Sequence, residues 1–302
     1  MLSLQLAHQL VDKNVLLVGA GDVAMTRIPK LLPTGCKLTI IAPEIHEDMW
    51  EYIDVEKKSN QTEFIDHAWD SNKNKIYQII QRGFENKDIV LFGTGLSHQE
   101  KIDEFFTGKL KLGDCLDMRD SNPGWHLIMT CIPNPVLSEY IYQGAKLVLG
   151  KNVLCNVADN PPLCDFYFGS NVILGDGEGN KPIQILISSN GNSPRFTSLL
   201  KQEIQDQYGN LPIGKSVSKL GKLRSQIRQN SEQNCPSDLS QLELIKYRME
   251  WIRNCTDAFG VAHCHEINID KTLKLFDEMF ADLSLEQPEK KVFLEEYLEN
   301  SS

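Results

Sequence analysis

The sequence lacks several features that would each indicate a different class of protein. No C-x-x-C pair occurs among its eight cysteines, so neither a zinc ribbon nor a redox-active dithiol is predicted. No apolar run approaches the ~20 residues that a membrane-spanning helix needs. The first residues have neither a basic start nor a cleavable apolar core. We therefore expect a cytoplasmic protein with reduced thiols and no membrane partner.

Positive charge is also scarce. Lys and Arg number 31 against 41 Asp and Glu, which gives a formal net charge of −10. Because phosphate binding needs a basic face, this balance argues against nucleic acid as the main partner. An anionic substrate would have to find a local basic patch. The 302 residues are enough for two or three domains with a sizeable core.

A dinucleotide-binding fingerprint stands near the N-terminus. An apolar strand is predicted over 14–18, and G-x-G-x-x-A follows it at once, opening a helical pattern that runs through Leu32. The first glycine makes the tight turn, the second lets the backbone approach a pyrophosphate, and the alanine allows close helix–strand packing. The helix N-terminus would face the phosphates. A Rossmann-like turn without a nucleotide is the alternative. The residues concerned are Gly19, Ala20, Gly21, Asp22, Val23 and Ala24.

Acidic residues after the second predicted strand, 37–42, favour NAD over NADP. A ribose-binding acid is expected about 20 residues beyond the glycines, and the nearest is Glu44, after Pro43. Between 43 and 56 there is no Lys or Arg to hold a 2′-phosphate, and several acids would repel one. A solvated loop would show the same composition, so that interpretation stays open.

Residues 57–124 are interpreted as an inserted excursion. Within it we expect a helix over 75–82 and a strand over 89–92. A second G-x-G at 93–95 is interpreted as a decoy, because its sixth position is His98 and no large βαβ unit surrounds it.

Strands predicted over 126–131 and 153–157, with a helix over 137–149 between them, complete a Rossmann-like doubly wound parallel sheet. Asp159 follows the last strand, and the prolines after it force the chain out of the sheet. Ligands bind at the carboxyl ends of such strands, so Thr130, Cys131 and Asp159 should line one crevice with the nicotinamide. Judged by its position alone, a turn-capping role for Asp159 is as good an interpretation as a catalytic one.

A hairpin is predicted over 171–188, followed by a helix with Ser193 as its N-cap. A two-stranded hairpin is not stable alone, so it must pack on something, a second subunit being one possibility. The remainder, 210–302, is almost all helical pattern. Basic residues stand in an acid-free stretch of it, and a solvated helix face and an anion-binding surface are equally good interpretations. They are Lys215, Lys219, Lys222, Arg224 and Arg228.

With these pieces assembled, the chain resembles the siroheme synthase family. The resemblance is to the members that combine precorrin-2 dehydrogenase and sirohydrochlorin ferrochelatase and lack a methyltransferase domain. It is carried by V-L-L-V-G-A-G-D-V-A at 15–24, N-V-A-D-N-P-P-L-C-D-F at 156–166 and I-L-I-S-S-N-G-N-S-P-R-F at 185–196. Further segments, K-L-G-K-L-R at 219–224 and C-T-D-A-F-G-V-A-H-C-H at 255–265, resemble the helical domain of fungal-type members.

The resemblance implies three parts: an NAD-binding Rossmann domain over 1–160, a region over 161–212 that builds a homodimer, and an all-helical C-terminal domain over 213–302. It also implies that precorrin-2 loses a hydride to NAD⁺ and that Fe²⁺, a substrate, is then inserted into sirohydrochlorin. Asp159 matches the family's essential aspartate and would be the general base, partly buried, for both steps.

Substrate carboxylates would be bound by a set of polar residues: Ser193 and Arg195 at the helix start, and Lys219, Lys222, Arg224 and Arg228. No resident metal is expected, since adjacent side chains such as His263 and His265 do not converge on a helix; His265 assisting iron entry is the weakest of these assignments. Other classes remain open: dehydrogenation without metal insertion, an ordinary NAD(H) oxidoreductase for a small substrate, and a non-catalytic NAD-binding redox sensor.

Overall fold

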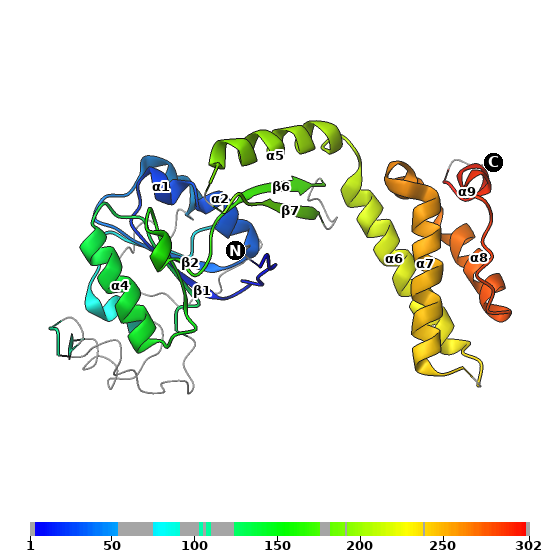
Figure 1. Cartoon of the computed structure of the whole chain (residues 1–302), viewed down its shortest axis with the longest axis horizontal. Coiled ribbons are helices and arrows are strands. Elements are labelled where there is room, and N and C mark those ends of the chain that lie inside the picture. The colour runs from blue at the N-terminus through cyan, green and yellow to red at the C-terminus, as the bar shows by residue number, and fades with distance from the viewer. Residues whose placement is uncertain are drawn as a thin grey trace. The chain divides into compact units, whose positions relative to one another are not determined.

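The computed structural model describes residues 4–53, 75–90, 103–104, 107–109, 124–175, 182–190, 192–237 and 239–299. Apart from the first three residues, the chain divides into two compact units, Leu4–Tyr167 and Phe168–Ser302 (Figure 1). The division into three parts stays a prediction.

A five-stranded sheet with the order β3-β2-β1-β4-β5 forms the core of the N-terminal unit, and every neighbouring pair in it is parallel. Its strands are apolar and almost wholly buried, as expected for a sheet covered on both faces. The strands predicted over 14–18, 37–42, 126–131 and 153–157 are confirmed. The five strands are β1 Asn14–Val18, β2 Lys37–Ile41, β3 Gln78–Ile80, β4 Leu127–Thr130 and β5 Leu154–Val157.

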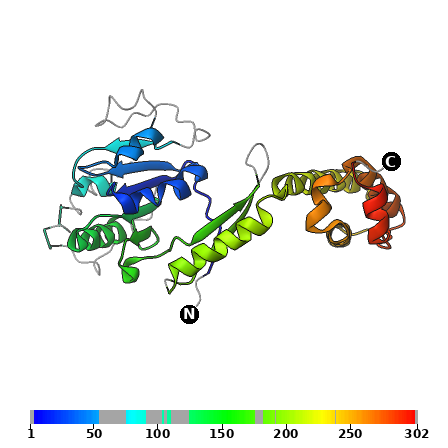
Figure 2. The same ribbon diagram turned by 90° about the horizontal axis from the view of Figure 1, so that it is seen from above.

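Helices cover both faces of this sheet (Figures 1 and 2). The steps from β1 to β2 and from β4 to β5 run in opposite directions, so right-handed crossovers place their helices on opposite faces. The first crossover holds α1 (Asp22–Met25) and α2 (Ile28–Leu31), and the second holds α4 (Pro135–Val148). The doubly wound parallel sheet is thereby confirmed.

The single helix predicted to run through Leu32 is wrong. The chain forms α1 and α2 instead, with Thr26 and Arg27 between them. Pro29 explains the break, because it has no N–H to donate to the carbonyl of Met25 and its ring clashes with that carbonyl in a continuous helix.

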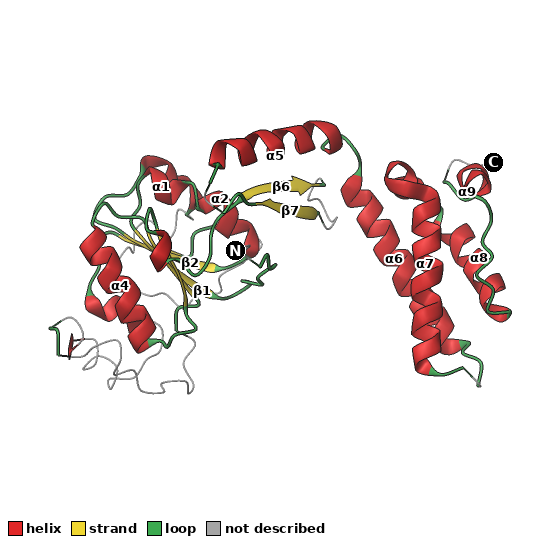
Figure 3. Cartoon of the chain, viewed as in Figure 1, coloured by secondary structure: helices red, strands yellow, loops and turns green. Residues whose placement is uncertain are grey.

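Two predictions between 75 and 90 are also wrong (Figure 3). The expected helix over 75–82 is the strand β3, which pairs with Thr39–Ile41 of β2. Its residues are buried on both faces, and such a short apolar run does not distinguish strand from helix by periodicity. Where a strand was expected from residue 89, a 3-10 helix covers Asn86–Val90. The G-x-G at 93–95 lies outside the described residues.

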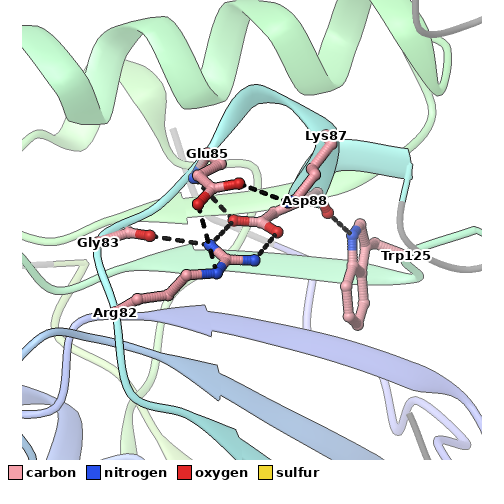
Figure 4. A network of polar contacts seen from close by, with 6 residues as sticks. All are labelled: Arg82, Gly83, Glu85, Lys87, Asp88 and Trp125. Atoms are coloured by element: carbon pink, nitrogen blue, oxygen red, sulfur yellow. Dashed lines mark hydrogen bonds and ion pairs between the residues drawn. The ribbon is translucent and has the colours of Figure 1, made fainter. Parts of the chain in front are cut away.

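A buried ion pair fixes the segment after β3 (Figure 4). Asp88 is fully buried, and its two carboxylate oxygens accept hydrogen bonds from Arg82 at 2.7 and 2.6 Å. The backbone N–H of Glu85 donates a third, at 2.7 Å. The indole Nε1 of Trp125 donates to the Asp88 carbonyl at 2.6 Å, which joins this segment to the residues just before β4.

The C-terminal unit begins with an antiparallel hairpin, β6 (Ser170–Leu174) and β7 (Ile183–Ile187). The hairpin packs on the helices that follow it, through Val172, Leu174 and Ile213. The predicted hairpin and helical remainder are confirmed. The helices are α5 Pro194–Tyr208, α6 Ile213–Gln233, α7 Gln241–His263, α8 Ile269–Ala281 and α9 Lys290–Glu296.

A second core lies among α6 to α9 and is aromatic. Trp251 is fully buried, and its ring meets that of Phe276 edge-on with centroids 5.2 Å apart. Phe259 and Phe293 make a similar contact at 5.1 Å. Edge-to-face pairs of this kind add to the free energy gained from burial alone.

Replacing Asp88 by Ala should lower the free energy of unfolding by about 1–3 kcal/mol, because it removes the buried acceptor of the hydrogen bonds from Arg82 and from the Glu85 N–H. Urea unfolding would measure this. Lys87→Ala is a matched control, since it removes only the exposed pair with Glu85 and should cost less than about 1 kcal/mol. Equal effects of the two changes would contradict a stabilising role for the buried pair.

Candidate active site

The carboxyl ends of β1, β4 and β5 are held level with one another. The N–H of Cys131, just past β4, donates to the carbonyl of Val18 in β1 at 2.7 Å. The N–H of Ala158, just past β5, donates to the carbonyl of Thr130 at 3.0 Å. The strand order reverses between β1 and β4, which is where open parallel sheets bind their ligands. The structure thus brings the fingerprint, Thr130, Cys131 and the Asp159 turn to one edge.

The fingerprint glycines have different surroundings. Gly19 has φ +102°, and a Cβ there would stand 2.3 Å from the carbonyl oxygen of Cys131, so no side chain fits. At Gly21 a Cβ would meet nothing within 4 Å. Gly21 is also the N-cap residue of α1, where no side chain caps the free N–H groups.

This open, uncapped turn fits a pyrophosphate, which would accept hydrogen bonds from the backbone N–H groups. Because α1 has only four residues, its dipole adds less than the long helix predicted there would have added. The N–H groups of the turn therefore carry the interaction.

The loop after β2 is tied back to the fingerprint by His46, which sequence reasoning missed. Its backbone N–H donates to the carbonyl of Ala20 at 3.0 Å, and its ring Nε2 lies 3.5 Å from the Asp22 carboxylate. Pro43 and Glu44 are exposed between β2 and this anchor, so Glu44 is accessible to a ribose. No sequence pattern marks a histidine at this distance from the glycines.

Cys131, just past β4 at this edge, is not suited to act as a nucleophile. Burial raises the pKa of its thiol, with a smaller opposing effect from the guanidinium of Arg27 that hydrogen-bonds to it. A thiol with a raised pKa stays protonated at neutral pH and is unreactive. Arg27, which lies between α1 and α2, was not predicted as a site residue either. Thr130, beside Cys131, is buried.

Asp159 stands alone at the tip of its turn. Its backbone is left-handed, with φ +58°, and its side chain is exposed, so the partial burial expected for it is not found. Its carboxylate makes no hydrogen bond or ion pair with any residue that the structure describes. The turn itself is closed by the N–H of Asn160, which donates to the Val157 carbonyl at 3.2 Å. The turn-capping interpretation therefore has no support.

A Tyr-x-x-x-Lys spacing, the pair used by some NAD-dependent oxidoreductases, was also missed. It consists of Tyr142 and Lys146 in α4. Lys146 is engaged elsewhere, since its Nζ donates to Asp165 at 2.6 Å and to the Val153 carbonyl at 2.5 Å. Burial raises the pKa of the Tyr142 hydroxyl, and the negative charge of Asp165 raises it further. Catalysis by this pair would need a lowered pKa. This pair therefore gives no support to a small-substrate oxidoreductase.

The predicted anion-binding residues of the C-terminal unit fall into two groups. The first group is paired with acids. Lys219 and Lys215 pair with Glu299 at 2.5 and 3.3 Å, and Arg228 pairs with Glu232 at 3.0 Å. The second group has exposed side chains that form no ion pair within the described part of the chain. Its members are Arg195, Lys222 and Arg224.

Ser193 is the N-cap residue of α5, yet its side chain does not cap the helix. Its N–H donates to the hydroxyl of Ser189 at 2.9 Å, which holds the turn before the helix. The side chain of Ser193 is exposed.

His263 ends α7, and Cys264 and His265 lie in the 3-10 helix Cys264–Glu266 that follows it. His263 lies 3.1 Å from Glu266, and Cys264 is buried in the aromatic core. Among the described residues, no group of three or more His, Cys, Asp or Glu side chains could hold a metal ion. None of the described helices is long and apolar enough to cross a bilayer.

Comparisons with known proteins match most of the chain. Residues 6–170 match a family described as putative NAD(P)-binding, residues 180–207 the central part of sirohaem biosynthesis proteins, and residues 211–285 their C-terminal part. The chain is 42% identical over 308 residues to a siroheme biosynthesis protein of Saccharomyces cerevisiae, with 98% of each covered. It is 30% identical over 229 residues to a siroheme biosynthesis protein of Schizosaccharomyces pombe, covering 75% of this chain and 63% of that one.

A solved structure, "SirC, precorrin-2 dehydrogenase", has the same fold. It aligns with a TM-score of 0.52 at 15% sequence identity, and the alignment covers 91% of this chain and all of that one.

The two glycines allow a matched pair of substitutions. Gly19→Ala should destabilise the fold by roughly 1–3 kcal/mol or more, because it combines a positive φ with a clash against Cys131. Gly21→Ala has room and an ordinary φ, so the melting temperature should stay unchanged while NAD⁺ binding weakens about tenfold or more. Thermal unfolding and calorimetric titration with NAD⁺ separate the two effects. Unchanged NAD⁺ affinity in Gly21→Ala would exclude this turn as the pyrophosphate site.

Proposed function

The chain belongs to the siroheme biosynthesis protein family, and from this premise we propose that it oxidises precorrin-2 with NAD⁺ to sirohydrochlorin and then inserts Fe²⁺ to give siroheme. The observation that carries the proposal is Asp159, an exposed carboxylate with no partner among the described residues, at the strand edge where the fingerprint lies. Both reactions release protons from the macrocycle, so each needs a base beside the bound ring.

NAD⁺ accepts the hydride when bound. The turn at Gly19 and Gly21 would hold its pyrophosphate, and the exposed Glu44 its ribose. Acidic side chains along 44–51 would repel a 2′-phosphate. Lys75 reaches this loop, where its Nζ donates to the Glu51 carbonyl at 2.9 Å.

We assign Asp159 as the general base of both steps. In dehydrogenation, precorrin-2 loses a hydride to NAD⁺ and a proton to the base; in metal insertion, Fe²⁺ replaces two pyrrole N–H protons. A carboxylate without a hydrogen-bond partner has free lone pairs for such a proton. Because the described part of the chain leaves Asp159 exposed, its desolvation has to come from the bound substrate and cofactor.

The substrate carries many carboxylates, which gives the unpaired basic residues a role. Lys222 and Arg224 on α6 and Arg195 on α5 would bind them, with Ser193 beside Arg195. Lys219 and Arg228 were also expected to do so, but their ion pairs with Glu299 and Glu232 make them weaker ligands. The Michaelis constant for precorrin-2 should therefore rise more in Lys222→Ala than in Arg228→Ala.

We also propose that the protein is a homodimer built on the hairpin and α5. Phe196 is 64% exposed, and Leu199 of the same helix and Ile173 and Ile183 of the hairpin are exposed apolar residues. An apolar surface of this kind marks an interaction site. Sedimentation velocity should show a dimer that Phe196→Glu dissociates; a monomeric native protein would contradict the assignment.

The deciding experiment is anaerobic: purified protein is mixed with precorrin-2 and NAD⁺ while NADH absorbance is followed, and Fe²⁺ is then added. We expect NADH to form first and the spectrum of the metallated product to appear after Fe²⁺ is added. With NADP⁺ in place of NAD⁺, kcat/KM should be at least about tenfold lower than with NAD⁺. NADH without accelerated metallation would leave a dehydrogenase alone. No NADH despite measurable NAD⁺ binding would overturn the proposal in favour of a redox sensor.

Asp159→Asn should lower both rates by about 10²- to 10⁴-fold, because Asn tolerates the left-handed backbone but cannot accept the proton. Affinity for NAD⁺ should not change. Asp12→Asn is a matched control, since Asp12 is exposed, has the same φ of +58° and precedes β1 at the opposite edge of the sheet. Full turnover in Asp159→Asn would exclude this residue as the base.

A further inference from the structure

The Asp159 turn is a narrow loop with two paired arms. After β5 the chain turns through residues 158–163 and comes back antiparallel, so that Cys164 bridges Asn156. The N–H of Asp165 donates to the Cys155 carbonyl at 2.8 Å. The side-chain amide of Asn156 donates to the carbonyl of Phe166 at 2.8 Å. Asp159 therefore stands at the tip of a loop whose returning arm is hydrogen-bonded to β5.

An ion pair between buried Lys146 and partly exposed Asp165 ties the two arms of the loop to the helix behind them. Lys146, in α4, has its side chain 8% exposed, and its Nζ donates to Asp165 at 2.6 Å and to the carbonyls of Val153 at 2.5 Å and Lys151 at 3.1 Å. The same oxygen of Asp165 accepts the N–H of Cys155 at 2.7 Å. One ammonium and one carboxylate thus join the end of α4, the start of β5 and the returning arm of the loop.

The position of Asp159 depends on the two paired arms of the loop, because no residue that the structure describes holds its side chain. The carboxylate has no hydrogen bond or ion pair with any of them, and its backbone is left-handed. The two arms of the loop therefore determine where it points. A displacement of about 1 Å at a reacting group can cost about 10²-fold in rate.

We propose that Lys146 and Asp165 are positioning residues that hold the Asp159 carboxylate against the substrate. The inference rests on the proposed function, in which Asp159 is the base. The ion pair acts through the backbone of the loop and does not contact substrate or cofactor.

The variant that tests this is Lys146→Met, which keeps the aliphatic stem in its buried place and removes the ammonium. Adding Asp165→Asn removes the unpaired carboxylate that Lys146→Met leaves behind, and it gives a second variant without the ion pair. Lys151→Met is the matched control, because Lys151 lies on the same connection with its side chain exposed and in no ion pair with a described residue. We expect kcat for NADH formation to fall about 10- to 100-fold in Lys146→Met, with the NAD⁺ dissociation constant unchanged and Lys151→Met like the native protein.

A double-mutant comparison separates positioning from a general loss of structure. If Lys146 acts through Asp159, Lys146→Met should have no further effect on the residual rate of Asp159→Asn. Hydrogen exchange gives a second readout that needs no activity: in Lys146→Met, peptides covering 156–166 should exchange faster while those covering β1 and β4 stay protected.

The outcomes are distinct. A native kcat in Lys146→Met, or unchanged exchange over 156–166, would overturn the positioning role while Asp159→Asn still loses activity. Equal losses from Lys146→Met in the native and Asp159→Asn backgrounds would also overturn it. Full turnover in Asp159→Asn would instead reject the proposed base itself, whatever the ion pair does.

Discussion

The parallel hydrogen-bond ladder that joins β1, β4 and β5 is the constraint on which the site depends. It pairs Val18 with Thr130 and Thr130 with Val157, so the three strands end at the same level. Their side chains are mostly apolar and carry no catalytic chemistry. Their register nevertheless decides that a nucleotide-binding turn, a half-buried thiol and a carboxylate emerge side by side. A shift of one residue in any strand would move the turn after it by about 3.3 Å along the sheet, so the register sets where the three turns emerge.

Ion pairs occupy several of the basic residues that were predicted to bind an anionic ligand. In a chain of net charge −10, Lys219 and Arg228 are bound by acids and Lys146 is buried against Asp165. Pairing of this kind satisfies charges that would be costly to bury alone. The predicted site residues that stay exposed and form no ion pair with a described residue include Asp159, Arg195, Lys222 and Arg224. Asp12 is equally exposed on the same left-handed backbone, so what marks the site is the position of Asp159 just past β5, at the strand edge that carries the fingerprint.

Sequence reasoning succeeded where one local rule controls the outcome and failed where several compete. Continuous apolar runs bounded by turns predicted four strands of the sheet, and the fingerprint predicted the turn at Gly19 because only glycine fits there. The helical period through Leu32 was apparent, but Pro29 interrupts it. The run that forms β3 was mistaken for a helix because burial on both faces removes the alternation that identifies a strand.

The sequence by itself determined the fold class, four of the five strands of the sheet and the position of Asp159 just after a strand, since these follow from the pattern of neighbouring residues. Only the tertiary structure decided which side chains meet. Glu299 reaches Lys215 across 84 residues, and Asp165 reaches Lys146 across 19. Whether a charged residue is paired or accessible depends on contacts between segments distant in the chain, and no local period encodes them. That is why the Tyr142 and Lys146 spacing is uninformative until the partner of Lys146 is known.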